Sequence, residues 1–126
     1  MTTWLILGAV FSLLTAYVPA FLLMARVGPA TYFGSRDDEG TPGPIHGRAK
    51  RAHANLQENF PVFALFGVLS MIVAGADTGM ALLGAQLFVV ARVLYLPLYL
   101  FAVPLVRSMV FAVGWVGLIL MGVALI

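Results

Sequence analysis

The chain has 126 residues, of which 62% are hydrophobic and 10% are charged, and its formal net charge is +2. With a mean hydropathy of +1.02, so short a chain has more apolar side chain than a soluble domain of its size could bury. The composition therefore excludes a soluble protein and indicates an integral membrane protein. The small positive excess includes no basic run, so no nucleic-acid partner is expected. Because the chain has no cysteine, it supplies no disulfide, thiol nucleophile or thiolate metal ligand.

Four apolar segments follow one another along the chain, at about residues 4–25, 60–76, 79–103 and 108–126. Each is close to the ~20 residues that a helix needs to cross ~30 Å of hydrocarbon. They are almost continuously apolar, unlike the alternating strands of a membrane barrel. We therefore expect an all-α integral membrane protein, a single domain over residues 1–126. Its fold should be an up-down bundle of four transmembrane helices, at about 4–25, 47–76, 79–103 and 106–126.

The polar segment at residues 27–46 is rich in Gly and Pro and mixes charges of both signs, which predicts a loop. Its acidic run at 37–39 is expected to be a solvated face. Five of the seven Lys and Arg residues lie in or beside this loop, and Arg107 lies at the third loop, whereas the second carries only Asp77. The positive-inside rule then places the first and third loops in the cytoplasm and both termini outside. We expect the membrane to be a bacterial inner membrane.

Charged and amide side chains gather where the second helix begins, in the stretch HGRAKRAHANLQENF at residues 46–60. At 100° per residue, four of them share an arc of roughly 80°: Arg48, Arg51, Asn55 and Glu58. His53 and Gln57 point the other way. The apolar part of this helix is slightly short for the hydrocarbon, so Glu58 should be drawn to membrane depth, where it cannot face lipid.

The third helix carries Arg92, Tyr95 and Tyr99 on one face, at i, i+3 and i+7. Arg92 lies near the middle of an apolar run, where an unpaired arginine costs about 2.5–3.5 kcal/mol on insertion scales. Glu58 is the acidic residue at comparable depth, so we predict that the two meet inside the bundle or across subunits. A purely structural ion pair that fixes helix register is the alternative.

The arginines outnumber their possible partner, because Glu58 cannot neutralise all of Arg26, Arg48, Arg51, Arg92 and Arg107. The surplus indicates an anionic ligand reached from the cytoplasm, and arginine suits carboxylates. Arg26 ends the first helix and Arg107, followed by Ser108, opens the fourth, so either could instead extend to lipid headgroups. His46 and His53 lack the spacing of a metal site, and no metal is expected.

Three stretches, RAHANLQEN at 51–59, RVLYLPLY at 92–99 and RS at 107–108, resemble the MAPEG family, the membrane-associated proteins in eicosanoid and glutathione metabolism. That family includes microsomal glutathione transferases, leukotriene C synthase and the inducible prostaglandin E synthase. The resemblance covers nearly the whole chain. Its most specific part is Arg51, Asn55 and Glu58 combined with the arginine and two tyrosines of the third helix.

The resemblance implies a homotrimer of four-helix subunits that binds glutathione between adjacent subunits, near the cytoplasmic side. Six residues would line the tripeptide: Arg51, Asn55, Glu58, Arg92, Tyr95 and Tyr99. Glu58 would meet its amino group and the arginines its carboxylates, with Arg26 and Arg48 extending the cluster. Arg107 would lie beside the sulfur and favour the thiolate, with Ser108 next to it. Tyr95 stands where some members have histidine.

This resemblance implies a membrane-embedded glutathione-dependent transferase or peroxidase. It would direct the thiolate of glutathione, a cosubstrate, against lipophilic electrophiles or lipid hydroperoxides. Its partners would be membrane lipid, a lipophilic small-molecule substrate and its own copies. The alternative is a non-catalytic membrane protein that binds lipid or another anionic ligand in the same pocket between subunits, because some relatives are accessory proteins.

Overall fold

The computed structural model describes residues 1–35 and 43–126, and within these residues the chain forms helices and no strands. Arg36 and the acidic run at 37–39 lie outside the described residues. The helices are α1 (Thr2–Val27), α2 (Pro29–Tyr32), α3 (Pro44–Ile72), α4 (Thr78–Leu100) and α5 (Pro104–Val123).

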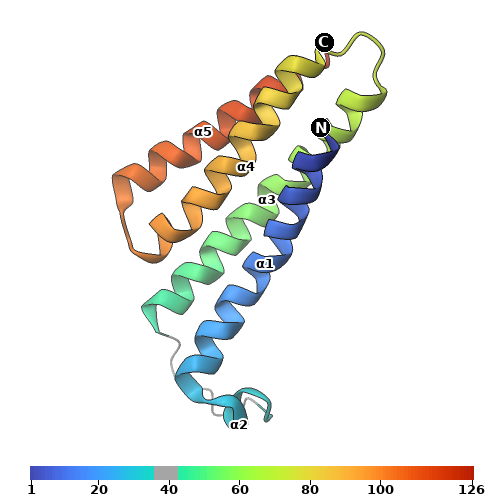
Figure 1. The fold of residues 1–126 in the computed structure, drawn as a ribbon. Helices are drawn as coiled ribbons and strands as arrows, with labels where there is room; N and C mark the ends of the chain where they lie inside the picture. The colour runs from blue at the N-terminus through green and yellow to red at the C-terminus, as the bar shows by residue number, and fades with distance from the viewer. Residues whose placement is uncertain (36–42) are drawn as a thin grey trace.

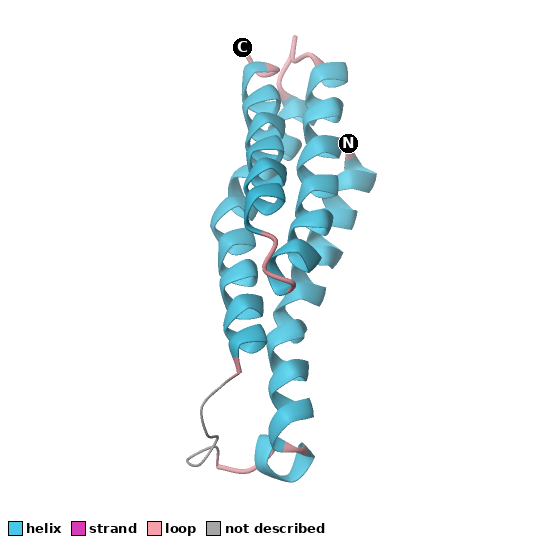
Figure 2. Ribbon diagram, turned by 90° about the vertical axis from the view of Figure 1, so that its left-hand side faces the viewer, coloured by secondary structure: helices cyan, strands magenta, loops and turns pink. Residues whose placement is uncertain are grey.

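The four long helices alternate in direction, so that α1 lies along α3 and α4 lies along α5 (Figures 1 and 2). Both termini and the turn between α3 and α4 lie at one end of the molecule. The connection from α4 to α5 and the segment that contains α2 lie toward the other end. This arrangement turns one face of α3 toward α1 and leaves another for α4 and α5.

Three described helices are long and apolar enough to cross a membrane: α1, α4 and α5. The expectation of an all-helical membrane protein is thereby confirmed. α3 is the longest helix, with 29 residues, but its first half carries the charged and amide side chains that begin at His46. It therefore combines a polar half with an apolar half.

Two local features differ from the sequence-based expectation. The expected loop at 27–46 contains the one-turn helix α2, which Pro29 starts at a position where its missing N–H costs nothing. The third long helix ends at Leu100 and not near 103, because Phe101 and Ala102 leave the helical path and Ala102 takes a positive φ of 56°. Pro104 then opens α5 instead of only closing α4.

The core lies where α3, α4 and α5 meet. Phe63 and Phe88 stack with their ring centroids 4.6 Å apart, and both are almost fully buried, as is Met121. α4 and α5 approach most closely at two glycines: a Cβ added to Gly84 would lie 2.5 Å from the carbonyl oxygen of Gly117. Backbone contact of this kind is how helices associate in lipid, where burial of apolar surface supplies little driving force.

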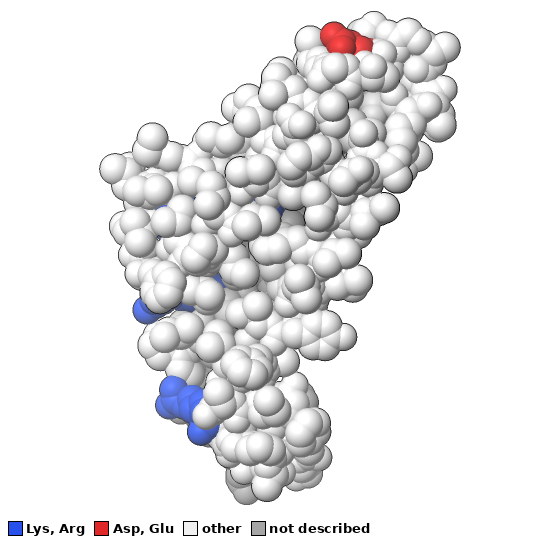
Figure 3. All heavy atoms as spheres, viewed as in Figure 1, with Lys and Arg blue, Asp and Glu red and all other residues white. Residues whose placement is uncertain are grey.

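Basic side chains lie away from the end of the molecule that carries Asp77. On the face shown in Figure 3, the visible Lys and Arg side chains lie over the middle and lower parts, and the visible acidic patch lies at the upper end. Asp77 is in the turn at the upper end, where its backbone N–H donates to the carbonyl of Ala124 at 2.8 Å.

Asp77 also caps α4, since its Oδ1 accepts a hydrogen bond from the backbone N–H of Met80 at 2.9 Å. We expect Asp77→Ala to lower the free energy of unfolding in detergent by about 1 kcal/mol, because it leaves a helix-start N–H unsatisfied. Asp77→Asn keeps a capping oxygen and should behave as the wild type. Equal destabilisation by both variants would show that the cap contributes nothing.

Candidate functional site

The polar side chains of α3 divide between two faces, as its periodicity predicts. Toward α1, the Nδ1 of His53 lies 3.1 Å from the Oγ1 of Thr15, and Gln57 donates to the Oγ of Ser12 at 2.8 Å. His53 and Gln57 therefore belong to the packing of α1 on α3. The face that carries Arg48, Arg51, Asn55 and Glu58 is left for α4 and α5.

At the basic end, two arginines of α3 bind the end of α4. Arg48 donates from Nη1 to the carbonyl oxygen of Leu100 at 2.7 Å, and this oxygen is one of those that a helix end leaves without an internal partner. Arg51 donates from Nε to the hydroxyl of Tyr99 at 3.3 Å. These contacts hold the start of α3 against the end of α4.

Arg92 lies deeper, with 3% of its surface exposed, between α3, α4 and α5. Its Nη1 donates to the Oδ1 of Asn55 at 2.9 Å. Its guanidinium carbon lies 5.0 Å from the ring centroids of both Phe88 and Phe111, which gives the charge cation–π contacts in place of an anion. Its Nε and Nη2 have no hydrogen-bond partner among the described residues.

The expected contact between Arg92 and Glu58 is not made within the subunit. Arg92 binds Asn55, while Glu58 is exposed and lines a cavity between α3 and α5. Helical geometry separates the two side chains, since a residue three positions after Asn55 is rotated by about 60° from it. Asn55 faces α4, and Glu58 turns toward α5.

A small polar cavity of about 240 Å³ lies beside this cluster, and six residues line it: Asn55, Tyr95, Tyr99, Arg107, Ser108 and Phe111. The rings of Tyr95 and Tyr99 are 5.3 Å apart, and the guanidinium of Arg107 lies 4.5 Å from the ring centroid of Tyr99. The hydroxyl of Ser108 donates to the carbonyl oxygen of Pro104 at 3.0 Å. The cavity thus combines one guanidinium with three hydroxyl groups.

A second cavity of about 400 Å³ adjoins the first, because both are lined by Asn55 and Phe111. It adds Glu58, Asn59, Val62, Phe66, Trp115, Leu118 and Ile119. We call the two cavities together the α3–α5 groove. Its end nearest Arg107 is cationic and hydroxylated, Glu58 supplies a carboxylate, and the remainder is apolar and aromatic.

The whole sequence fits one family. The sequence model of the MAPEG family matches residues 1–126, the full length of the chain. The chain belongs to the MAPEG family. No curated protein matches it. Membership confirms the resemblance carried by the stretches at 51–59, 92–99 and 107–108, and it suggests a role in glutathione or eicosanoid metabolism.

The structure of this MAPEG protein gathers every predicted site residue except Arg26 along the face that α3 turns toward α4 and α5. The guanidinium of Arg26 lies against Gly43 instead, beside a separate cavity lined also by Leu22 and His46. The reason is that α1 packs on the opposite face of α3, which directs the end of α1 away from the groove. Within one subunit, Arg26 does not line the groove.

The two histidines of this MAPEG chain are both engaged with α1. The Nδ1 of His46 lies 2.9 Å from the carbonyl oxygen of Pro19, and that of His53 lies beside Thr15. In the described ranges, no three His, Cys, Asp or Glu side chains come together in a way that could hold a metal ion.

Phe111 is the main site residue that sequence reasoning missed. It lines both halves of the groove, packs its ring 5.8 Å from that of Tyr95 and covers the guanidinium of Arg92. A signal was present, since Phe111 follows Arg107 by four residues and so shares its helical face. Phe111 is an apolar residue in an apolar helix, so the sequence does not distinguish it from its neighbours before the position of Arg92 is known.

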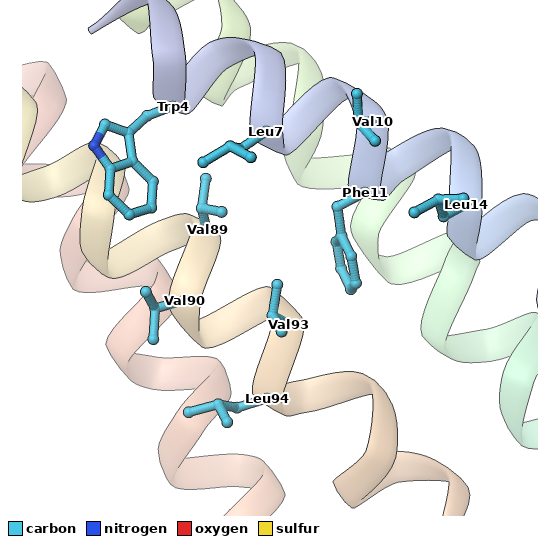
Figure 4. Close-up of a pocket in the computed structure, with 9 residues that line it drawn as sticks. All are labelled: Trp4, Leu7, Val10, Phe11, Leu14, Val89, Val90, Val93 and Leu94. Carbon is cyan, nitrogen blue, oxygen red and sulfur yellow. The ribbon is translucent and has the colours of Figure 1, made fainter.

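A separate apolar cavity of about 380 Å³ lies between α1 and α4. Figure 4 shows its lining side chains reaching toward one another from the two helices. It is lined only by apolar and aromatic residues, and it shares none of them with the α3–α5 groove. Apart from the indole N–H of Trp4, this lining has no polar side-chain group for an anionic ligand.

Proposed function

We propose that this MAPEG protein is a membrane-embedded, glutathione-dependent enzyme, a transferase or a peroxidase, that acts on lipophilic electrophiles or lipid hydroperoxides. The observation that carries the proposal is the charge pattern of the α3–α5 groove. The guanidinium of Arg107, the hydroxyls of Tyr95 and Tyr99 and one carboxylate, that of Glu58, line the groove, and Arg51 donates to the hydroxyl of Tyr99. Glutathione carries two carboxylates and one ammonium group, and this pattern is complementary to it.

Each charged group of the ligand has a matching partner in the proposal. Glu58 receives the ammonium group, and arginine donors at the basic end, Arg51 among them, receive the carboxylates. Tyr95 and Tyr99 pack along the peptide and donate from their hydroxyls. Asn55 contributes an amide, and the apolar remainder of the groove borders the bilayer, from which a lipophilic second substrate would enter.

Arg107 is the residue that we assign to thiol activation. A free thiol has a pKa of ~8.5 and is mostly protonated at neutral pH, and a nearby guanidinium in a water-poor pocket favours the anion. Ser108 follows Arg107 and lines the same cavity. Its hydroxyl, which donates to the carbonyl of Pro104 in the free protein, would turn to donate to the sulfur.

The thiolate then has two possible reactions. In a transferase, the sulfur attacks an electrophilic carbon, a C–S bond forms, and the leaving group departs with its electron pair. In a peroxidase, the sulfur attacks one oxygen of a hydroperoxide, the O–O bond breaks, and the alkoxide takes up a proton to leave as an alcohol. A second glutathione then displaces hydroxide from the sulfenic acid, which gives the disulfide and water.

We further propose a homotrimer whose subunits each span the membrane with four helices in an up-down bundle, with the first and third loops in the cytoplasm. The exposure of Glu58 supports association, because a carboxylate facing lipid is costly and a neighbouring subunit would cover it. In this arrangement the partner's α1 brings its own Arg26 to the groove. Arg48, which binds the end of α4, sits at the same basic end.

The proposed role of Glu58 predicts a specific loss of binding. Glu58→Gln should weaken glutathione binding, measured by calorimetry in detergent, by at least about 10-fold, because a charge-assisted hydrogen bond to the ammonium group is lost. Asp77→Asn makes the same chemical change at the opposite end of the molecule and should leave the affinity unaltered. Wild-type affinity in Glu58→Gln would refute the assignment.

The apolar part of the groove supports a second candidate function. Val62, Phe66 and Trp115 extend the site well beyond what a polar tripeptide requires. A non-catalytic protein could use this length for an acyl chain and the arginines for an anionic headgroup. Such a protein has no need to ionise glutathione, so thiolate formation separates the two functions.

A further inference from the structure

Arg92 is held in place by more than one contact, although no carboxylate within residues 1–35 and 43–126 pairs with it. It is buried to 3% exposure, flanked by the rings of Phe88 and Phe111, and bound through Nη1 to Asn55. A Cβ added to Gly114 of α5 would lie 3.6 Å from both Nε and Nη2, so the guanidinium also lies close against the α5 backbone. The side chain therefore has little freedom to turn away from Asn55.

This contact fixes which way the Asn55 amide faces. A guanidinium has only N–H donors, so the Asn55 atom that faces it must be the acceptor Oδ1. The Nδ2 of the same amide must then point away from Arg92. It has no acceptor in the described part of the chain, and Asn55 lines both halves of the α3–α5 groove.

We propose that Arg92 is a positioning residue that locks the Asn55 amide as a hydrogen-bond donor to the groove. The groove then takes a carbonyl or carboxylate oxygen at this point and disfavours an ammonium or another donor. The naming of glutathione as the ligand rests on the proposed function, whereas the locking of the amide does not. Without Arg92 the amide can rotate and present Oδ1, which places an acceptor against the acceptor of the ligand.

Together with Glu58, the Asn55 donor determines the direction in which a ligand binds. Asn55 and Glu58 lie one turn apart on α3 and line the same cavity, and one offers a donor while the other offers an acceptor. A ligand that carries an oxygen acceptor and an ammonium group must therefore bind in one direction. Reversal would place the ammonium against N–H groups and the oxygen against a carboxylate.

A ligand-free experiment tests the locking directly. The chain contains only two asparagines, Asn55 and Asn59, so selective ¹⁵N labelling of asparagine gives two side-chain NH₂ signal pairs. We expect Arg92→Met to shift or broaden the Asn55 pair. The Asn59 pair, whose Nδ2 donates to the carbonyl of Asn55 at 2.7 Å, should stay in place. Arg92→Lys, which retains a donor and a charge, should restore much of the Asn55 signal. An Asn55 pair unchanged by Arg92→Met would overturn the proposal.

Affinity for glutathione supplies the functional test. Arg92→Met and Asn55→Ala should each weaken binding by about 10-fold. The double variant should bind no more weakly than the poorer single variant, because both substitutions remove the same hydrogen bond from the Asn55 amide to the ligand. Losses that multiply would contradict action through Asn55.

Asn55→Asp provides a variant in which folding is favoured, since its carboxylate would give Arg92 the anion it lacks. It removes the donor and should bind glutathione at least as poorly as Asn55→Ala. Wild-type affinity in Asn55→Asp would refute the donor role. If the wild type binds no glutathione, the proposed function fails, while the asparagine signals still decide whether Arg92 locks the amide.

Discussion

Replacement of Arg107 by alanine is expected to lower glutathione-dependent turnover by about 100-fold, the usual scale for losing one group that stabilises a developing anion. Glutathione binding should be largely retained, because other arginines and Glu58 hold the charged ends of the tripeptide. The loss of turnover is expected because the guanidinium of Arg107 lies over the Tyr99 ring and lines the polar cavity. Turnover with a lipophilic aryl halide and affinity by calorimetry would separate the two effects.

Lys50→Ala is the matched control for this variant. Lys50 is also cationic and lies near the start of α3. It is exposed, and it lines neither half of the groove. It should keep wild-type turnover. Unchanged turnover in Arg107→Ala, or a loss of turnover accompanied by loss of the oligomer, would contradict a direct role for Arg107.

Gly117→Ala is expected to have the largest effect on stability. Its Cβ would lie 2.6 Å from the carbonyl oxygen of Gly84 and 2.8 Å from the backbone nitrogen of Phe88. Both are backbone atoms of α4 and cannot turn aside, so α4 and α5 must separate. We expect a loss of about 1–3 kcal/mol in the free energy of unfolding in detergent. Because Phe111 of α5 covers Arg92 of α4, glutathione affinity should fall as well.

Gly114→Ala is the control for this change, on the same helix and one turn earlier. A Cβ there would lie 3.5 Å from the Cβ of Ala91, which is ordinary van der Waals distance. Its stability should therefore remain close to that of the wild type. Equal destabilisation by the two variants would show that close approach of the backbones at Gly84 and Gly117 is not what holds α4 to α5.

The sequence predicted which faces of the long helices carry polar groups, because helical periodicity alone sets this. The split of α3 into a face with Asn55 and a face with His53 follows from 100° per residue, and the structure confirms it through the contacts with α1 and α4. The burial of Arg92 agrees with its predicted place near the middle of an apolar segment.

The partner of Arg92 did not follow from the sequence, because periodicity gives the face of a residue but not the rotation of one helix against the next. Asn55 and Glu58 share an arc of α3, and only the packing of α4 and α5 decides which one Arg92 meets. A preference for pairing opposite charges favoured Glu58. The rings of Phe88 and Phe111, which the sequence could not place, supply part of what an anion would have supplied.

The position of Arg26 was not predicted from the sequence for a different reason. Its count among the surplus arginines suggested a shared site, but charge composition does not say which face of α3 a neighbouring helix covers. The structure directs it to Gly43, away from the groove of its own subunit. A role for Arg26 in the groove therefore depends on the proposed trimer, whereas the roles proposed for Arg51 and Arg107 do not.

The central claim is that the α3–α5 groove binds glutathione and ionises its thiol. The most direct test is a titration of the detergent-purified protein with glutathione, monitored by the ultraviolet absorbance of the thiolate, with Arg107→Ala measured in parallel. We predict a saturable rise in thiolate absorbance at neutral pH that is absent in Arg107→Ala. Saturable binding by calorimetry without any thiolate signal would contradict the claim and would favour a non-catalytic binding protein.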